Sequence, residues 1–230
     1  MVIGALAAST ERLRLGVLVC GLARRRPWKV ARETASLDVL SNGRLVFGAG
    51  LGSLAEEEFE RFGEEPDARV RAAKLDEGLE ILAGLWSGEP FEHRGEKFTV
   101  RETCFRPPPV QRPRIPIWIG GRWPARPPFR RAARWDGVFP THREVGEAET
   151  MTPDQLREIV AYTTAHRQAA TRFDVVIEGQ TAGVAPAREL EAVDVYREAG
   201  LTWWIEKLGW FRGPLEAMRA RIDSGPPRDG

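Results

Sequence analysis

Glycines gather at two places where the backbone could pass close to a bound cofactor. Gly48, Gly50 and Gly52 occupy alternate positions in GAGLGS, and Gly120 and Gly121 end the apolar run IPIWIGG. A backbone without Cβ can approach a flat ring or a phosphate closely, and free N–H groups ahead of a helix favour an anion. A tight turn between a strand and a helix would need one glycine, not three in alternation. We therefore expect cofactor contacts at these glycines.

The other reactive side chains form no arrangement typical of a hydrolase or a metal site. His93, His142 and His166 belong to neither an HExxH motif nor a Ser/His/Asp arrangement. Cys20 and Cys104 are far apart and in no CxxC spacing, which indicates two reduced thiols in a cytoplasmic protein. We predict no bound metal, and the sequence names no catalytic acid or base.

Charge and composition narrow the class of partner. The chain has 230 residues, with 34 Lys and Arg against 33 Asp and Glu, a formal net charge of +1. A surface without an excess of either sign favours neither nucleic acid nor acidic membrane as a partner. Hydrophobic residues make up 42% of the chain, but their runs stop short of the roughly 18 residues that a membrane helix needs. We expect a single globular domain over residues 1–230.

Hydrophobic patterns predict strands and helices in turn along the chain. The expected strands cover residues 13–20, 44–48, 115–121, 136–140, 173–179 and 202–207. The expected helices cover residues 27–40, about 56–62, a stretch that includes 75–86, and then 129–135, 153–169, 186–199 and 214–222. A hairpin that turns near Arg94 and Gly95, followed by many prolines, predicts an insertion at about 88–115.

This alternation implies right-handed crossovers and a parallel sheet covered by helices on both faces. Six strands fit an open doubly wound sheet, and they also fit an incomplete barrel of eight. The first glycine-rich segment follows the second strand instead of the first, and it lacks the GxGxxG spacing. That placement argues against an open dinucleotide-binding sheet, although the count of repeats leaves both architectures open.

Four segments resemble the bacterial luciferase-like family of flavin- and deazaflavin-dependent oxidoreductases in their order and spacing. They are TERLRLGVLV, LDVLSNGRLVFGAGLGSLAEEEFERFG, RPRIPIWIGGRWP and RRAARWDGVFPTH, and LDEGLEILAGLW also resembles the family. The resemblance is strongest from Ile3 to Pro140. It implies an α/β fold of the (β/α)₈ TIM-barrel type, here incomplete. The six strands would correspond to the third through the eighth, with no counterpart of the first two before Met1.

On the cofactor's ring side, the resemblance assigns residues at the ends of two strands. Leu18 and Val19 match a bulge where a non-proline cis peptide is common and supports the flavin ring. Gly48 and Gly50 match the loop beneath that ring.

On the phosphate side, the resemblance assigns Gly120 and Gly121 together with residues of DGVFPTH. Thr141 would offer its hydroxyl to the phosphate, and Arg143 would add positive charge. His142 is the histidine that could also contact it.

The resemblance implies a flavin-dependent oxidoreductase that uses FMN or a deazaflavin coenzyme and acts on a small organic substrate. Family members either activate oxygen for monooxygenation or exchange hydride with the substrate, and the sequence does not separate the two. The alternative is a non-catalytic flavin-carrying or structural homologue that lacks part of the active site. The family is often dimeric, so we expect a chain able to form a homodimer. Trp203, Trp204 and Trp210 would then serve core packing or a subunit contact.

Overall fold

The computed structural model describes residues 1–52 and 54–227, which divide into two compact units, residues 1–120 and residues 121–230. Ser53, inside the glycine-rich segment, lies outside the described residues. The division falls within one strand, between Gly120 and Gly121. The assignment of one domain to residues 1–230 stays a prediction.

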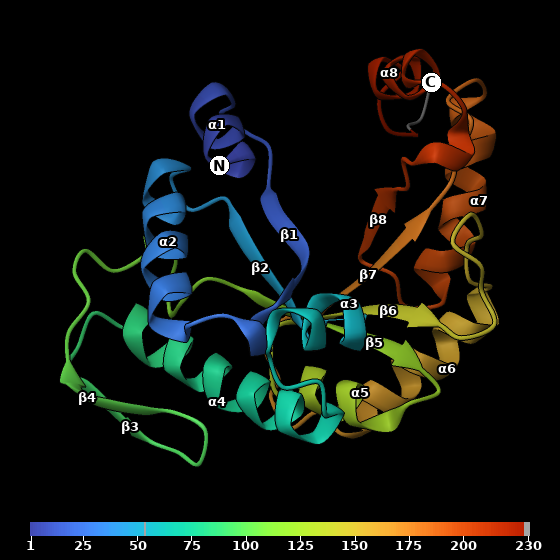
Figure 1. The fold of residues 1–230 in the computed structure, drawn as a ribbon. Coiled ribbons are helices and arrows are strands. Elements are labelled where there is room, and N and C mark those ends of the chain that lie inside the picture. Colours follow the sequence, from blue (N-terminus) through green and yellow to red (C-terminus); the bar gives the residue numbers. More distant parts are fainter. Residues whose placement is uncertain (53, 228–230) are drawn as a thin grey trace. The chain divides into compact units, whose positions relative to one another are not determined.

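Residues 1–120 alternate helices and strands and end in a hairpin and a further strand (Figure 1). The elements are α1 (Val2–Ser9), β1 (Leu15–Gly21), α2 (Pro27–Leu40), β2 (Leu45–Gly50), α3 (Ala55–Glu58), α4 (Ala68–Trp86), β3 (Phe91–Arg94), β4 (Thr99–Thr103) and β5 (Ile117–Trp123), with 3-10 turns at Leu22–Arg24 and Glu60–Phe62. β1 pairs in parallel with β2, and β2 pairs in parallel with β5.

Local sequence signals account for the two long helices of this unit. α2 begins at Pro27, whose fixed φ suits the first helical position, and ends before Asn42 and Gly43, which have φ of 53° and 76°. The α4 helix begins after Asp67, whose carboxylate accepts the N–H groups of Arg69 and Val70.

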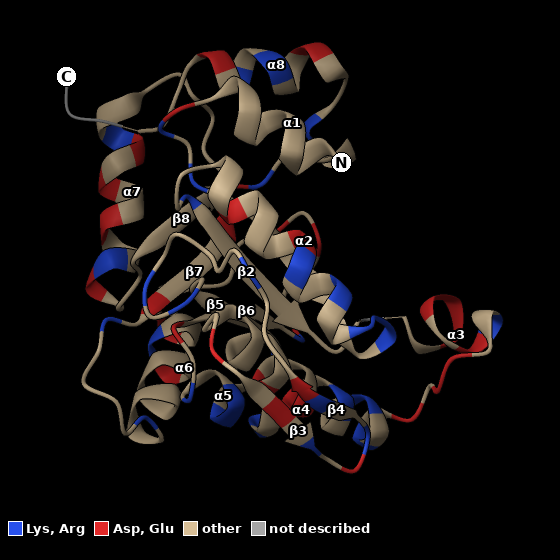
Figure 2. Ribbon diagram, turned by 90° about the vertical axis from the view of Figure 1, so that its left-hand side faces the viewer, with Lys and Arg blue, Asp and Glu red and all other residues tan. Residues whose placement is uncertain are grey.

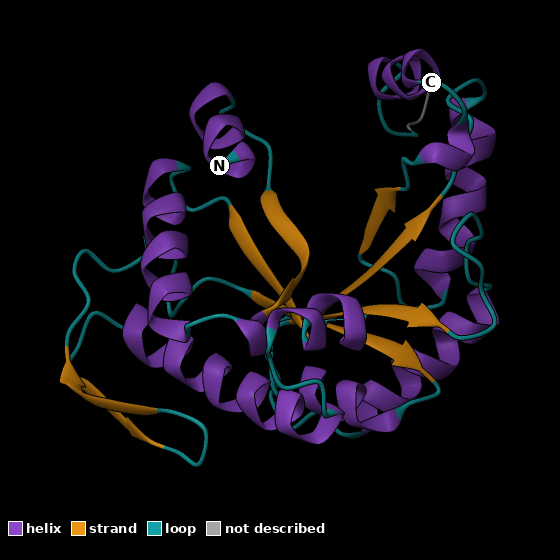
Figure 3. Ribbon diagram, in the orientation of Figure 1, coloured by secondary structure: helices purple, strands orange, loops and turns teal. Residues whose placement is uncertain are grey.

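The two helices pack against each other beside the strands (Figure 3). Trp86, at the end of α4, is 1% exposed and donates its indole N–H to Ala31 O and to Thr34 Oγ1 of α2, at 3.2 and 3.1 Å. Burying a large side chain of this kind contributes roughly 1.5–3 kcal/mol. Its indole N–H, the only polar group of the side chain, is hydrogen-bonded as well.

The hairpin expected within residues 88–115 is present as the antiparallel pair β3 and β4. Glu77 of α4 holds its turn, because the carboxylate accepts the N–H groups of Lys97 and Phe98 and lies 3.3 Å from His93 Nε2. Burial by itself would raise the pKa of Glu77, but these hydrogen bonds outweigh it and the pKa is lowered.

Residues 121–230 continue the alternation. The elements are α5 (Arg126–Ala132), β6 (Gly137–His142), α6 (Pro153–Ala165), β7 (Asp174–Gly179), α7 (Pro186–Glu198), β8 (Trp203–Glu206), a 3-10 turn at Trp210–Arg212 and α8 (Leu215–Asp223). β6 pairs in parallel with β7, and β7 with β8. Helices α7 and α8 each carry charges of both signs (Figure 2). The core includes the fully buried Phe129, Leu156, Ile159 and Ile177.

The strand order confirms the prediction that the alternating strands and helices form a sheet of the barrel type. In the described residues, the six-stranded sheet has the order β1-β2-β5-β6-β7-β8, with the β3-β4 hairpin outside it. Strands that follow one another in the chain are therefore neighbours in the sheet, as in a (β/α) barrel. A doubly wound sheet would reverse the order at a switch point.

Some boundaries differ from the expected ones. α5 begins at Arg126, three residues before the expected Phe129, because Pro127 and Pro128 fit a first helical turn that needs no N–H donors. β6 extends to His142, so Thr141 lies in a strand and not in a loop. None of the helices in the described part is long and apolar enough to cross a membrane.

Candidate functional site

Strand β1 departs from regular pairing at the residues expected to face a cofactor ring. Its register with β2 shifts between Val17 and Cys20, and the peptide bond between Leu18 and Val19 is cis. Both Leu18 and Val19 are half-buried. Bulges of this kind re-aim side chains and are common next to active sites. The bulge is present as expected, while its contact with a cofactor stays a prediction.

The neighbouring glycines make room for this bulge. A Cβ on Gly48 would lie 2.2 Å from Val17 O, and a Cβ on Gly50 would lie 2.8 Å from Val19 Cγ2. On β5, a Cβ on Gly120 would lie 3.0 Å from Val19 Cγ1. The Val19 side chain thus lies against one glycine on the neighbouring strand β2 and one on the next strand, β5. Close packing inside the sheet accounts for these glycines, in addition to any approach of a ligand.

Gly52 serves the turn that follows β2. Its φ is 84°, and a Cβ there would lie 2.7 Å from the ring of Phe59, which is 1% exposed. The Arg71 guanidinium lies 4.7 Å from the centre of that ring and donates to Gly52 O at 3.1 Å. The third glycine of the segment is therefore explained by a left-handed turn over a buried aromatic ring.

In residues 121–230, the ends of β5 and β6 lie side by side. Thr141 Oγ1 is 3.4 Å from Gly121 O, and the Arg143 N–H donates to Trp123 O at 2.9 Å. Arg122 and Arg143 are exposed, and their guanidinium groups form no ion pair or hydrogen bond within the described residues. Two free cations and a hydroxyl at adjoining strand ends fit an anionic group such as a phosphate.

The helix after β5 offers this anion fewer backbone donors than the sequence suggested. Gly120 and Gly121 lie inside β5, not at the junction with the helix, and α5 has seven residues. Pro124, Pro127 and Pro128 carry no N–H, and the N–H of Ala125 already donates to Arg122 O at 3.1 Å. Side chains would therefore have to supply most of the contacts with a phosphate.

The packing of α5 against β5 explains why residue 121 is a glycine. A Cβ at this position would lie 2.6 Å from Pro128 Cβ, at the first turn of α5. The glycine thus lets the helix approach the strand closely.

A cavity of about 180 Å³ lies at the C-terminal ends of β6, β7 and β8. Its polar lining includes Thr141 and His142 of β6, Glu178 of β7 and Lys207, which follows β8. The C-terminal ends of parallel strands are where (β/α) barrels place their sites. Sequence reasoning missed Glu178 and Lys207. A charged residue at the end of an apolar strand, as in FDVVIEG and TWWIEK, is the signal that could have found them.

The polar groups of this cavity differ in how far the protein satisfies them. His142 is 8% exposed, and its Nδ1 accepts the N–H of Glu144 at 3.2 Å. This bond places the ring proton on Nε2, which has no partner within residues 1–52 and 54–227. Lys207 Nζ donates to the carbonyl oxygens of Glu147 and Glu149, at 2.9 and 3.1 Å.

Glu178 is a half-buried acceptor that lines the cavity and is left unsatisfied by the described residues. Its side chain makes no hydrogen bond or ion pair within the part of the chain that the structure describes. The register of β6 with β7 pairs Val138 with Val175, so Glu178 falls beside Thr141, and the next residue, His142, points to the opposite face of the sheet. No group of three or more His, Cys, Asp or Glu side chains among the described residues could hold a metal ion.

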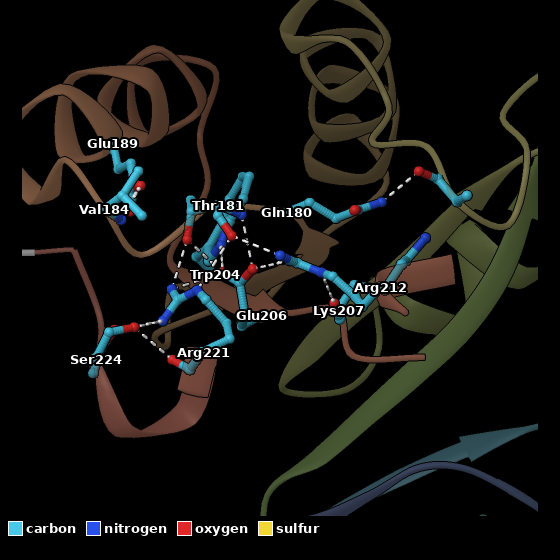
Figure 4. Close-up of polar contacts among 12 residues, drawn as sticks. Gln180, Thr181, Val184, Glu189, Trp204, Glu206, Lys207, Arg212, Arg221 and Ser224 are labelled. Carbon is cyan, nitrogen blue, oxygen red and sulfur yellow. Dashed lines mark hydrogen bonds and ion pairs between the residues drawn. The ribbon is translucent and has the colours of Figure 1, made fainter. Parts of the chain in front are cut away.

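A polar cluster centred on Glu206 supports this end of the sheet (Figure 4). The Glu206 carboxylate accepts from Thr181 N and Thr181 Oγ1, at 2.7 and 2.8 Å, and pairs with the guanidinium groups of Arg212 and Arg221. Arg212 also donates to Lys207 O at 3.1 Å. The cluster thus ties the segment after β7 to the segment after β8, both of which adjoin the cavity.

The Glu206 carboxylate is ionised within this cluster. Burial by itself would raise its pKa, but the hydrogen bonds from Thr181 and Trp204 and the positive charge of Arg221 outweigh burial, and the pKa is lowered.

The chain is similar to known proteins in sequence and in fold. The chain is 36% identical over 119 residues to the oxygenase component of a flavin-dependent trigonelline monooxygenase from Acinetobacter baylyi, a match that covers 52% of this chain and 32% of the relative. It is 36% identical over 124 residues to an F420-dependent glucose-6-phosphate dehydrogenase from Microbacterium testaceum, covering 54% of this chain and 36% of the relative. The match thus spans about a third of each relative's length.

Solved structures show the same fold. The coenzyme F420-dependent tetrahydromethanopterin reductase from Methanopyrus kandleri superposes with a TM-score of 0.75 and 16% identity, covering 97% of this chain and 85% of the reductase. The named relatives and this neighbour therefore use flavin or F420 cofactors. The model of the luciferase-like monooxygenase family matches residues 1–220. The chain belongs to the luciferase-like monooxygenase family.

Proposed function

We propose that this chain is a flavin- or deazaflavin-dependent oxidoreductase that acts on a small organic substrate. The observation that carries the proposal is that Arg122 and Arg143 have guanidinium groups without a partner among the described residues, at the same strand ends as the Thr141 hydroxyl. FMN and the deazaflavin coenzyme F420 both contain phosphate. Family membership over residues 1–220 supports a cofactor of this type.

The phosphate-binding part of this proposal rests on residues 121–230 alone, and the role of residues 1–120 is a separate proposal. In residues 121–230, Thr141 and Arg143 would bind the phosphate, with Gly121 setting the close approach of α5. In residues 1–120, Leu18 and Val19 would support the ring with their bulge. When bound, the cofactor supplies hydride transfer, and FMN also supplies oxygen activation.

The ring-side glycines have an indirect part in this proposal. Gly48, Gly50 and Gly120 hold the β1 bulge in place, because a side chain at any of them would meet Val17, Leu18 or Val19 at 3.0 Å or less. Their contribution is to leave room for the bulge, so that Leu18 and Val19 keep their orientation.

Cofactor titration of the full chain tests the proposal. FMN and F420 are added separately, and binding is followed by their visible absorbance and fluorescence. Arg143→Met and Thr141→Val should each weaken binding of the preferred cofactor. One lost charge-assisted hydrogen bond is worth roughly 1.5–3 kcal/mol, so Arg143→Met should weaken it by about tenfold to a hundredfold. Arg188→Met is the matched control, because Arg188 is exposed on α7 and has no partner within the described residues.

The titration also separates the two reaction classes. Preference for FMN predicts monooxygenation, measured as oxygen consumption with the reduced cofactor. Preference for F420 predicts hydride transfer, measured as a change in its absorbance. Binding of neither cofactor, or equal affinity of the parent and Arg143→Met, would refute the proposal. We further propose a homodimer located in the cytoplasm, and light scattering checks the assembly.

A further inference from the structure

We infer that Glu178 makes the phosphate-binding region of residues 121–230 select a phosphodiester over a phosphomonoester. This region consists of Arg122, Thr141 and Arg143. The inference rests on the proposed function, because it takes a flavin-type cofactor to bind there through its phosphate. It goes beyond that function by naming the kind of phosphate and the residue that selects it. Of the two cofactors proposed for this chain, FMN ends in a phosphomonoester and F420 contains a phosphodiester.

The pairing of three neighbouring strands places Glu178 in line with this region. The register of β6 with β7 sets Thr141 beside Glu178 near the C-terminal ends of both strands. The hydrogen bond from Arg143 N to Trp123 O sets Thr141 beside Arg122 of β5 in the same way. Residues that pair in register point to the same face of a sheet. Arg122, Thr141 and Glu178 therefore form one row across three strands.

This row lies on the face of the sheet that is turned away from α5. Trp123, which follows Arg122 in the chain, packs its ring against Phe129 of α5, with 5.1 Å between the ring centres. Successive side chains of a strand point to opposite faces, so Arg122 points away from that helix. The cavity of about 180 Å³ includes both Thr141 and Glu178 in its lining, which agrees with their position on one face.

The charges of the row and of Arg143 favour a ligand with a single negative charge. Arg122 and Arg143 carry two positive charges and Glu178 one negative charge, and none of the three side chains has an ion pair within the described residues. A phosphomonoester carries about −1.5 to −2 at pH 7, whereas a phosphodiester carries one negative charge. Glu178 repels both, but it repels the monoester up to about twice as strongly.

The other charged groups nearby do not compensate for Glu178. The Lys207 ammonium is held by the carbonyl oxygens of Glu147 and Glu149, at 2.9 and 3.1 Å. The loop after β6 adds the carboxylates of Glu144, Glu147 and Glu149, which belong to exposed residues. Salt screens exposed charges more than partly buried ones. The half-buried Glu178 is therefore the carboxylate with the largest expected effect on a bound phosphate.

Flavins that differ only at the phosphate test this selection. Riboflavin, FMN and the methyl ester of FMN share one ring and one ribityl chain, but they carry no charge, nearly two negative charges and one negative charge. Each compound is titrated into the full chain at neutral pH, and binding is followed by flavin fluorescence. We expect the methyl ester to bind at least as tightly as FMN, and riboflavin to bind more weakly than either.

Two substitutions of Glu178 separate its charge from its shape. Glu178→Gln should tighten FMN binding by about tenfold and methyl ester binding by about threefold, because the lost repulsion scales with the charge of the ligand. Riboflavin affinity should not change. Glu178→Asp keeps the charge and should keep the parent's preference for the ester. Raising the salt concentration should reduce the difference between Glu178→Gln and the parent.

The matched control is Glu191→Gln, because Glu191 is exposed on α7. This variant should bind all three flavins like the parent, and circular dichroism of each variant confirms that it is folded.

Three results would overturn the inference. They are tighter binding of FMN than of its methyl ester by the parent, equal or no change in the affinities for the two in folded Glu178→Gln, and a change of the same size for riboflavin. A chain that binds FMN with any of these results keeps the proposed function and loses the selection by Glu178. A chain that binds none of the three flavins and no F420 loses both.

Discussion

Replacing Glu206 by glutamine is expected to destabilise the fold by about 3 kcal/mol. The substitution keeps the side-chain shape but removes the charge that faces Arg212 and Arg221, which are 14% and 6% exposed. Removing one partner of a buried ion pair costs roughly 3–5 kcal/mol, because the other charge stays buried without compensation. The lower end applies here, since the Glu206 side chain is 19% exposed and both guanidinium groups keep other acceptors.

Thermal unfolding followed by circular dichroism measures this loss. For a chain of 150–250 residues, 1 kcal/mol corresponds to roughly 2–4 °C, so Glu206→Gln should lower the Tm by about 6–12 °C. Urea unfolding should give the same free energy with an unchanged slope. Glu191→Gln is the control, because an exposed substitution away from special features usually changes stability by less than about 0.5 kcal/mol.

The dependence of folding stability on pH, below neutral pH, is a second test of the role of Glu206. Because the pKa of Glu206 is lowered in the folded chain, its contribution is fully present above the unfolded carboxyl pKa of about 4.3 and is lost as pH falls below it. Glu206→Gln should therefore lose less stability than the parent between about pH 5 and pH 3. A Tm within 2 °C of the parent (about 1 kcal/mol or less), together with a parallel acid profile, would refute a net stabilising role for the cluster.

Three further substitutions test the physical reasons given for the fold. Gly48→Ala should cost about 1–3 kcal/mol in urea unfolding, since its Cβ would meet Val17 O at 2.2 Å. Gly4→Ala in α1 should instead stabilise by about 0.5–1 kcal/mol, because nothing lies closer than 3.7 Å. Asp38→Asn should cost about 1–3 kcal/mol, because its buried Oδ2 accepts two backbone N–H groups that an amide nitrogen would oppose. A neutral effect at Gly48 or Asp38, or a loss at Gly4, would contradict the packing argument for that position.

The order of elements could be predicted from the sequence because it depends on local signals. Hydrophobic alternation and helix-start prolines act over a few residues, and α2 has the expected bounds, Pro27–Leu40. Ends that depend on tertiary pairing were displaced. β6 continues through Thr141 to His142, and the N–H of Arg143 donates to Trp123 O on the neighbouring strand, a contact that no local pattern encodes.

The candidate site was predictable only in part, because some of its residues follow local patterns and others depend on tertiary contacts. Leu18 and Val19 were placed by resemblance, and the bulge is there. The packing of Gly50 and Gly120 on Val19 joins residues far apart in the sequence, so it could not be inferred. Glu178 and Lys207 acquire their importance from a cavity that three strand ends build together. A single charged residue in a strand carries no such information by itself.

Thr141 stands between two groups of charged side chains in residues 121–230. Its hydroxyl lies 3.4 Å from Gly121 O, two residues before Arg143, and the residue also lines the cavity that contains Glu147, Glu149 and Glu178. A phosphate would therefore be attracted by the nearby arginines and repelled by these carboxylates.

This arrangement predicts different effects of two substitutions on cofactor affinity. Arg143→Met should weaken binding of the preferred cofactor, because it removes a cation from the phosphate-binding region. Glu178→Gln should leave the affinity unchanged or raise it, because it removes a carboxylate that would repel a phosphate. Titration of both variants by absorbance or fluorescence measures the two affinities. If the two substitutions weaken cofactor binding equally, charge does not place the phosphate, and this reasoning is wrong.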